Sequence, residues 1–175
     1  MIENLNSLES NKMAYALRST RRPLVVAGVH PPGGWVPYSK GVYVYKCKGD
    51  GNCFWRAAAV QMYGDQDTYI RVRREVVAYV KRTPDLHIQD LPLALALEAS
   101  GFASLDEWIE ATLTDSYFGG FIEAALLALC YNYRVEVVTG AVPSLPATQV
   151  FNPDGKLALR FYFNRAHYDA IFVTI

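Results

Sequence analysis

One cysteine of the sequence lies in a segment with the features of a nucleophile. The segment 49–53 reads Gly-Asp-Gly-Asn-Cys and joins a predicted strand to a helix that we expect to begin at or near Cys53. The N-terminus of a helix carries partial positive charge and unpaired N–H groups, which stabilise a thiolate. The two glycines permit a tight turn that directs several backbone N–H groups at one point, as an oxyanion hole requires. The segment therefore predicts nucleophilic catalysis by Cys53.

A thiol nucleophile needs a base, and the chain offers three histidines. We interpret His30, in a Pro/Gly loop, and His87, in a polar connection between helices, as surface or loop residues. His167 lies between two predicted strands, and Asp169 follows two residues later. If this segment is extended, side chains at i and i+2 share a face, so the carboxylate can reach the imidazole. We therefore predict His167 as the base and Asp169 as the residue that orients it.

These residues carry a resemblance to a known family. The block Asp50-Gly51-Asn52-Cys53, followed by Phe54 and Trp55, and the block His167-Tyr168-Asp169 resemble the ovarian-tumour (OTU) cysteine proteases in type, chain order and separation. Between them, Gly119-Gly120-Phe121-Ile122-Glu123 and the strand at 135–138 are similar to a third block of that family. The resemblance runs from about Tyr43 to Phe172.

The resemblance implies a papain-like fold and a deubiquitinating activity. Cys53 would attack the carbonyl carbon of a C-terminal glycine of ubiquitin or a ubiquitin-like modifier, alone or in polyubiquitin chains. His167 would deprotonate Cys53 and later protonate the leaving lysine amine, and Asp169 would orient His167. Asp50, Gly51 and Asn52 would shape the oxyanion hole, although Asp50 as the acid is the open alternative. The resemblance implies no metal and no organic cofactor.

The sequence departs from the family at one position of the substrate cleft. Members often carry a tryptophan directly before the paired glycines, and this chain has Phe118 there. We expect Trp55, Phe118, Gly119 and Tyr168 to line the narrow channel for a Gly-Gly tail. Two other functions stay open, namely cleavage of a viral polyprotein and binding of ubiquitin without turnover. The N-terminal extension and the compact size are similar to viral members.

Several further residues are expected to have structural rather than chemical roles. Cys47 on a predicted strand and Cys130 in an apolar run are expected to be packing residues. A zinc site that includes Cys47, Cys53 and His167 is disfavoured, because the sequence has no close Cys or His pair at metal-ligand spacing. The basic residues of the segment 71–82 are expected to form the solvated face of a helix, and they are Arg71, Arg73, Arg74, Lys81 and Arg82.

Helices and strands must position these residues, and their expected order along the chain predicts an α+β fold, with central helices on a small, mostly antiparallel sheet. Helices are expected over 67–81, over 91–100, after a capping box at Ser104 and Glu107, and over 120–131. Strands are expected over 41–47, 134–139, 148–151, 157–164 and 170–174, with a turn at 152–155. We interpret 41–175 as the catalytic domain and 1–40 as an N-terminal extension, with a strand at 23–29 and, before it, either a helix near 10–19 or partial disorder.

The composition limits the partners and the location. A chain of 175 residues with 51% hydrophobic and 19% charged residues favours one globular domain. The formal net charge is zero, which disfavours nucleic acid as a partner. Three cysteines are an odd number and favour a reducing compartment. Residues 1–12 lack the pattern of a signal peptide, and no apolar run approaches the ~20 residues that span a bilayer. We expect a cytoplasmic monomer without membrane contact, in the host cytoplasm if viral, or a soluble segment of a larger protein.

Overall fold

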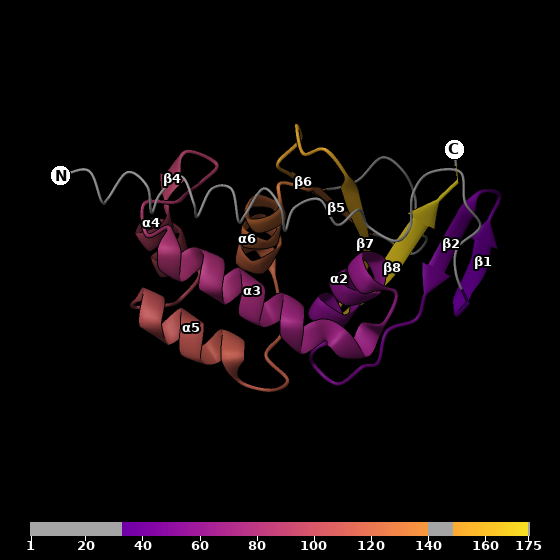
Figure 1. The fold of residues 1–175 in the computed structure, drawn as a ribbon, viewed down its shortest axis with the longest axis horizontal. Coiled ribbons are helices and arrows are strands. Elements are labelled where there is room, and N and C mark those ends of the chain that lie inside the picture. The colour runs from indigo at the N-terminus through magenta and orange to yellow at the C-terminus, as the bar shows by residue number, and fades with distance from the viewer. Residues whose placement is uncertain (1–32, 140–148, 175) are drawn as a thin grey trace, which may run out of the picture.

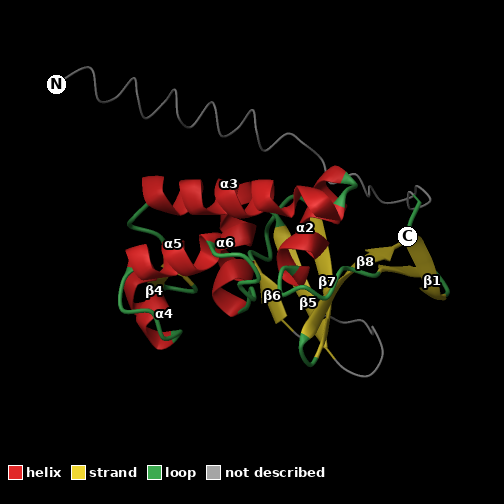
Figure 2. Ribbon diagram, turned by 90° about the horizontal axis from the view of Figure 1, so that it is seen from below, coloured by secondary structure: helices red, strands yellow, loops and turns green. Residues whose placement is uncertain are grey.

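The computed structural model describes residues 33–139 and 149–174. The expected helix near 10–19 and strand at 23–29 lie outside the described residues, as does His30. A sheet occupies one side of the molecule and a group of helices the other (Figures 1 and 2). The α+β fold with helices on a mostly antiparallel sheet is confirmed.

Strands from both ends of the described chain form a six-stranded sheet in the order β1-β2-β8-β7-β5-β6. Neighbours are antiparallel except β5 and β7, which are parallel. A separate two-stranded pair, β3 with β4, lies among the helices. The strands are β1 Trp35–Ser39, β2 Val42–Tyr45, β3 His87–Ile88, β4 Leu91–Pro92, β5 Arg134–Thr139, β6 Gln149–Phe151, β7 Ala158–Asn164 and β8 His167–Val173.

The helices pack on one another and on the sheet. Helix α2 contacts β7 and β8 on one side and α3 on the other, and α6 joins α3 to β5. In Figure 1, α4 and α5 lie at the end of the molecule opposite β1 and β2. The helices are α2 Cys53–Tyr63, α3 Tyr69–Arg82, α4 Leu93–Ala99, α5 Leu105–Leu113 and α6 Phe121–Tyr131, and a short 3₁₀ helix, η1, covers Gln66–Thr68.

Local sequence explains where the helices begin and end. Helix α5 begins after Ser104, whose Oγ accepts the N–H of Glu107 at 3.2 Å. The Glu107 carboxylate reaches back to the N–H of Ala103 at 2.6 Å, so the expected capping box is present with a shift of one residue. Helix α2 ends at Gly64 and α6 at Asn132, both in the left-handed conformation that closes a helix.

One detail of the predicted elements is wrong. His167 is the first residue of β8 rather than part of a connection, because the β7–β8 hairpin turn contains only residues 165 and 166. His87 lies in the connection between α3 and α4 and is exposed, as expected, and it is part of the short strand β3 within that connection.

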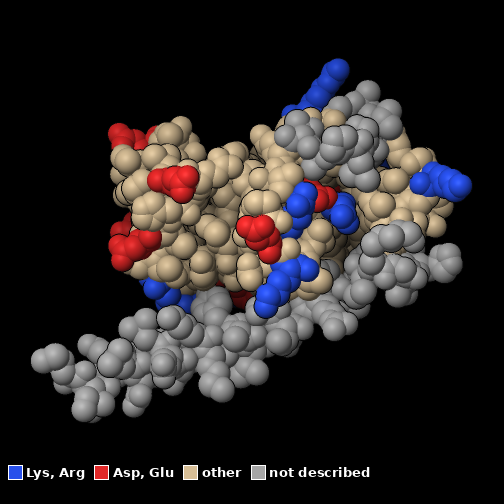
Figure 3. Space-filling model, turned by 90° about the horizontal axis from the view of Figure 1, so that it is seen from above, with Lys and Arg blue, Asp and Glu red and all other residues tan. Residues whose placement is uncertain are grey.

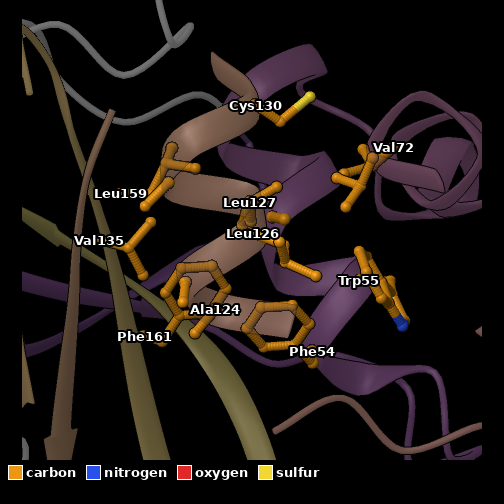
Figure 4. Packing of buried hydrophobic residues seen from close by; sticks show 14 of the residues in the cluster. Phe54, Trp55, Val72, Ala124, Leu126, Leu127, Cys130, Val135, Leu159 and Phe161 are labelled. Carbon is orange, nitrogen blue, oxygen red and sulfur yellow. The ribbon is translucent and has the colours of Figure 1, made fainter. Parts of the chain in front are cut away.

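The core lies between the sheet and the helices. Helix α3 turns Val72, Val76 and Val80 inward, while Ile70 on its first turn is 44% exposed. Figure 4 shows side chains of α2, α6, β5 and β7 meeting in this core. On the face shown in Figure 3, lysine and arginine side chains lie among aspartate and glutamate side chains, as the equal numbers of both charges suggest.

Candidate active site

Cys53 is the first residue of α2 and follows the loop 48–52, here called the Cys53 loop. Its side chain is buried, and its Sγ accepts the backbone N–H of Tyr168 at 3.4 Å. Burial raises the pKa of the Cys53 thiol, while the N–H groups of Tyr168, Phe54 and Cys53 itself act in the opposite direction. Because burial has the larger effect, the thiol requires a base to become a nucleophile.

His167 and Asp169 lie on one face of β8, as the i, i+2 spacing predicts. His167 Nε2 is 3.1 Å from Asp169 Oδ1. A side chain on Gly49 would begin 3.9 Å from His167 Nδ1, so this second ring nitrogen faces the Cys53 loop. In the tautomer that the Asp169 contact favours, Nε2 donates to the carboxylate and Nδ1 is free to accept a proton.

The Asp169 carboxylate is itself fixed by three donors. It is 3% exposed, and Oδ1 also accepts the backbone N–H of Cys47 at 2.9 Å. Lys46 Nζ lies 2.7 Å from Oδ2. The carboxylate therefore has a fixed position from which it orients the His167 ring.

Asp50 has a different partner. Arg56 Nε lies 3.1 and 3.0 Å from its two carboxylate oxygens, and Oδ1 accepts the N–H of Asn52 at 3.1 Å. The Arg56 guanidinium holds the pKa of the Asp50 carboxyl well below its usual range. Asp50 thus shapes the Cys53 loop, whereas Asp169 contacts His167. The geometry favours Asp169 over Asp50 as the orienting acid.

The Cys53 loop packs against the α5–α6 connection. Gly51 has φ +80°, and a Cβ there would lie 2.5 Å from the Ser116 carbonyl oxygen. The Asn52 side chain is 1% exposed and bonds Asp115 and the N–H of Ser116, each at 3.1 Å. The side chain of Asn52 therefore points into the protein, so its amide is not available as an oxyanion donor. The expectation that the loop Asp50 to Asn52 shapes an oxyanion hole thus concerns backbone N–H groups, including that of Cys53.

Aromatic side chains lie beside Cys53. Phe118 is 40% exposed, and its ring centroid lies 5.5 Å from that of Tyr168 and 6.3 Å from that of Phe163. A Cβ on Gly119 would lie 2.5 Å from the Phe54 ring, so this glycine permits the close approach of the loop to α2. Phe118, Gly119 and Tyr168 thus come together next to the nucleophile.

The expectation that Trp55 lines the substrate cleft is wrong. Trp55 is 0% exposed and belongs to the core, with its ring 5.1 Å from that of Phe54. In Figure 4 the Trp55 side chain lies on the same side of the view as Val72 of α3, whereas Phe54 lies beside Phe161 of β7, with 5.0 Å between the ring centroids. The Trp55 side chain supports α2 from the helical side instead of contacting a substrate.

Sequence reasoning missed the role of Glu123. This carboxylate is 3% exposed and accepts Trp108 Nε1–H at 2.8 Å, the Tyr117 hydroxyl at 2.9 Å and the Gly120 N–H at 2.7 Å. It fixes the loop that carries Phe118 and Gly119. The signal was an acidic residue in the first turn of a helix that is otherwise apolar.

The expectation that Arg73 belongs to a solvated helix face is also wrong. Arg73 is 3% exposed, whereas its neighbours Arg71 and Arg74 are exposed. Its guanidinium lies between α3 and the Cys53 loop, where Nη2 contacts Asn52. A charged residue in an amphipathic helix normally lies on the solvent side, and no local pattern around Arg73 indicates an inward orientation.

Two other features are absent from residues 33–139 and 149–174. These ranges contain no group of three or more His, Cys, Asp or Glu side chains arranged to hold a metal ion. No helix in them combines the length and the apolar character needed to cross a membrane.

A thiol at a helix N-terminus, beside a His–Asp pair on the neighbouring strand, defines a cysteine-protease type of site. The family model "OTU-like cysteine protease" matches residues 48–168, well over half of the chain. The chain therefore belongs to the OTU-like cysteine protease family.

Known proteins agree with this family in sequence and in fold. OVARIAN TUMOR DOMAIN-containing deubiquitinating enzyme 6 of Arabidopsis thaliana is 29% identical over 102 residues, which cover 58% of this chain and 18% of that protein. The chain thus spans less than a fifth of the length of this relative. The OTUD1 OTU domain has a TM-score of 0.59 at 22% identity, over 76% of this chain and 87% of the domain. The Hazara virus OTU bound to ubiquitin has a TM-score of 0.54 at 20% identity, over 81% and 95%.

Proposed function

We propose that this chain is a deubiquitinating cysteine protease, which hydrolyses the isopeptide bond after the C-terminal Gly-Gly of ubiquitin or a ubiquitin-like modifier. The observation that carries the proposal is the site itself, where Tyr168 N–H lies 3.4 Å from Cys53 Sγ and His167 lies 3.1 Å from Asp169 on the same strand. The family, the deubiquitinating relative and the ubiquitin-bound neighbour support the substrate class.

The proposed reaction begins with a proton transfer. His167 Nδ1 takes the Cys53 proton, and the thiolate attacks the carbonyl carbon of the terminal glycine. The N–H groups of Cys53 and Phe54 donate hydrogen bonds to the carbonyl oxygen and stabilise its negative charge. When the intermediate collapses, the C–N bond breaks and the imidazolium gives its proton to the leaving lysine amine. Water then attacks the thioester with His167 as base and releases the modifier's carboxylate and the thiol.

The aromatic residues near Cys53 suit the substrate tail. A Gly-Gly tail has no side chains, so a narrow channel walled by Phe118 and Tyr168 can admit it and exclude bulkier segments. Burial raises the pKa of Tyr168 to about 12, so this wall stays neutral at pH 7.

The test is a covalent adduct with ubiquitin that carries a C-terminal thiol-reactive group, detected by intact mass. Wild-type protein should form one adduct, Cys53→Ala should form none, and His167→Ala should react about 100-fold or more slowly because the buried thiol loses its base. Cys130→Ala is the matched control, since Cys130 is a buried thiol on α6 and its loss should leave the adduct intact.

The other outcomes decide between the alternatives. An adduct that persists in Cys53→Ala contradicts the assigned nucleophile. Ubiquitin binding without an adduct supports a binding module, and reaction with neither ubiquitin nor a ubiquitin-like modifier favours a polyprotein junction as the substrate. Wild-type cleavage of diubiquitin into monomers would complete the case for hydrolysis.

We also propose a reducing, cytoplasmic location. Cys47, Cys53 and Cys130 are all free thiols in the structure, which supports such a compartment.

A further inference from the structure

Arg73 of α3 is a buried cation with well-defined partners. Its Nη2 donates to Asn52 Oδ1 at 2.6 Å, and its Nη1 donates to the Thr114 carbonyl oxygen at 2.9 Å. The guanidinium carbon lies 5.6 Å from the centroid of the Trp55 ring and 5.5 Å from that of Tyr69. Because burying a charge is costly, the favourable contacts of Arg73 must compensate, and they fix its geometry.

Asn52 is the point at which Arg73 meets the active site. It immediately precedes Cys53, and its carbonyl accepts the Arg56 N–H at 2.9 Å in the first hydrogen bond of α2. Its side chain oxygen receives Arg73 and the Ser116 N–H together, and its amide donates to Asp115. A shift of Asn52 would therefore shift the N–H groups that begin α2.

We propose that Arg73 is a positioning residue for catalysis, which acts through Asn52 to fix the oxyanion donors at Cys53 and Phe54 and to tie the Cys53 loop to the α5–α6 connection. The inference rests on the proposed function. The Arg73–Asn52 bond is charge-assisted and short, so it orients the Asn52 amide more firmly than the neutral Ser116 bond does alone.

A purely structural role makes different predictions. Loss of a supporting arginine would lower stability and weaken every property of the site together. Loss of a positioning residue should lower the rate of acyl transfer, which develops an oxyanion, more than the rate of thiol alkylation, which does not. Substrate binding by the aromatic cleft should change little.

The experiment compares four changes in the full chain: Arg73→Met, Arg73→Lys, Asn52→Ala and the Arg73→Met/Asn52→Ala double variant. Hydrolysis of ubiquitin with a fluorogenic C-terminal amide gives kcat and KM. Alkylation of Cys53 by iodoacetamide is followed by peptide mass, and circular dichroism melts report folding. Arg74→Met is the matched control, because Arg74 is the adjacent, exposed arginine of the same helix.

We expect kcat to fall about 10- to 100-fold in Arg73→Met and less in Arg73→Lys, with KM within about threefold of wild type. The alkylation rate should fall by a smaller factor than kcat, because the same N–H groups also stabilise the thiolate. The double variant should be no more than about threefold slower than the slower single variant, because both changes remove the same Arg73–Asn52 hydrogen bond. Arg74→Met should match wild type.

Other results overturn the inference. Arg73 would be a structural residue if kcat were undiminished in Arg73→Met, or if the alkylation rate fell in proportion to kcat. The same conclusion would follow if the reductions of kcat in the two single variants multiplied in the double variant. If Arg73→Met does not fold, Arg73→Lys and Asn52→Ala decide the question by the same measurements. A wild-type protein that alkylates at Cys53 but does not hydrolyse the ubiquitin substrate would overturn the proposed function, and this inference with it.

Discussion

The two aspartates near Cys53 have different partners and therefore different roles. Asp169 is buried on β8 and contacts His167, whereas the side chain of Asp50 is 39% exposed and pairs with Arg56. Arg56 is almost completely buried and also contacts Asp67 at 2.6 Å. The Asp50–Arg56 pair therefore fastens the Cys53 loop to α2 and to η1, and its effect should appear in stability.

The depressed pKa of Asp50 gives this effect a pH dependence. A carboxyl whose pKa is lower in the folded state contributes stability above its unfolded value, 3.8, and loses it as pH falls toward the folded value. Asp50→Asn should therefore melt at lower temperature than wild type at pH 7, and the difference should begin to narrow as pH falls below about 4. Thermal melts at pH 7, 5 and 3 measure it, and a difference that is constant with pH would contradict the assignment. Because Asp50 is partly exposed, the contribution is smaller than for a buried pair.

Some features of the candidate site could be predicted from the sequence and others could not. Cys53, His167 and Asp169 could be proposed because their side chains carry chemistry and the chain has few cysteines and histidines, and the structure brings His167 and Asp169 into contact. Trp55 and Arg73 were misplaced because orientation within a helix depends on what packs around it. Helix α2 is buried on nearly all sides, so its pattern shows no preferred face.

At the scale of elements, the hairpin turn between β7 and β8 delivers the base. Asn164 pairs with His167, and Arg165 adopts φ +58° within the turn.

The sheet order was less predictable than the strands themselves. Parallel pairing of β5 with β7, with β6 on the outer side of β5, depends on contacts between segments far apart in sequence. Local patterns do not encode such pairings, and only the mostly antiparallel character was predicted.

The Cys53 loop depends on a glycine that permits two close-packed elements. An alanine in place of Gly51 would have to adopt the left-handed φ of +80°, and its Cβ would lie 2.5 Å from the Ser116 carbonyl oxygen. Gly51→Ala should cost about 1–3 kcal/mol of stability and lower kcat/KM about 10-fold or more, because the loop must move away from the α5–α6 connection. Thermal melts and hydrolysis of a fluorogenic ubiquitin substrate measure the two effects.

Gly101→Ala is the matched control for this prediction. Gly101 has φ +91°, but a Cβ there would meet nothing within 4 Å. This variant carries the backbone strain without the clash, at a helix end away from Cys53. It should lose stability and keep its activity, so equal activity loss in both variants would show that strain alone explains the effect.

At the scale of the whole molecule, a single cluster of buried side chains joins the helices to the sheet. It includes residues of α2, α3, α4, α5 and α6 together with β5, β7 and β8. Because the elements that carry Cys53 and His167 share this core, we expect the described part of the chain to unfold as one cooperative unit. The nucleophile and the base should then lose their geometry together.

Two leucines of the helical layer test this cooperativity. Leu126 of α6 is 0% exposed in the core, and Leu95 of α4 is 50% exposed. Leu126→Ala should lower the free energy of unfolding by about 2–5 kcal/mol, because it removes buried methyl groups and leaves a cavity. Leu95→Ala should change it by no more than about 0.5 kcal/mol. Urea denaturation should show coincident transitions by circular dichroism and tryptophan fluorescence in both variants. A Leu126→Ala protein whose circular dichroism and fluorescence transitions do not coincide would show instead that the described elements do not unfold as one unit, and catalysis could then fail while part of the molecule is still folded.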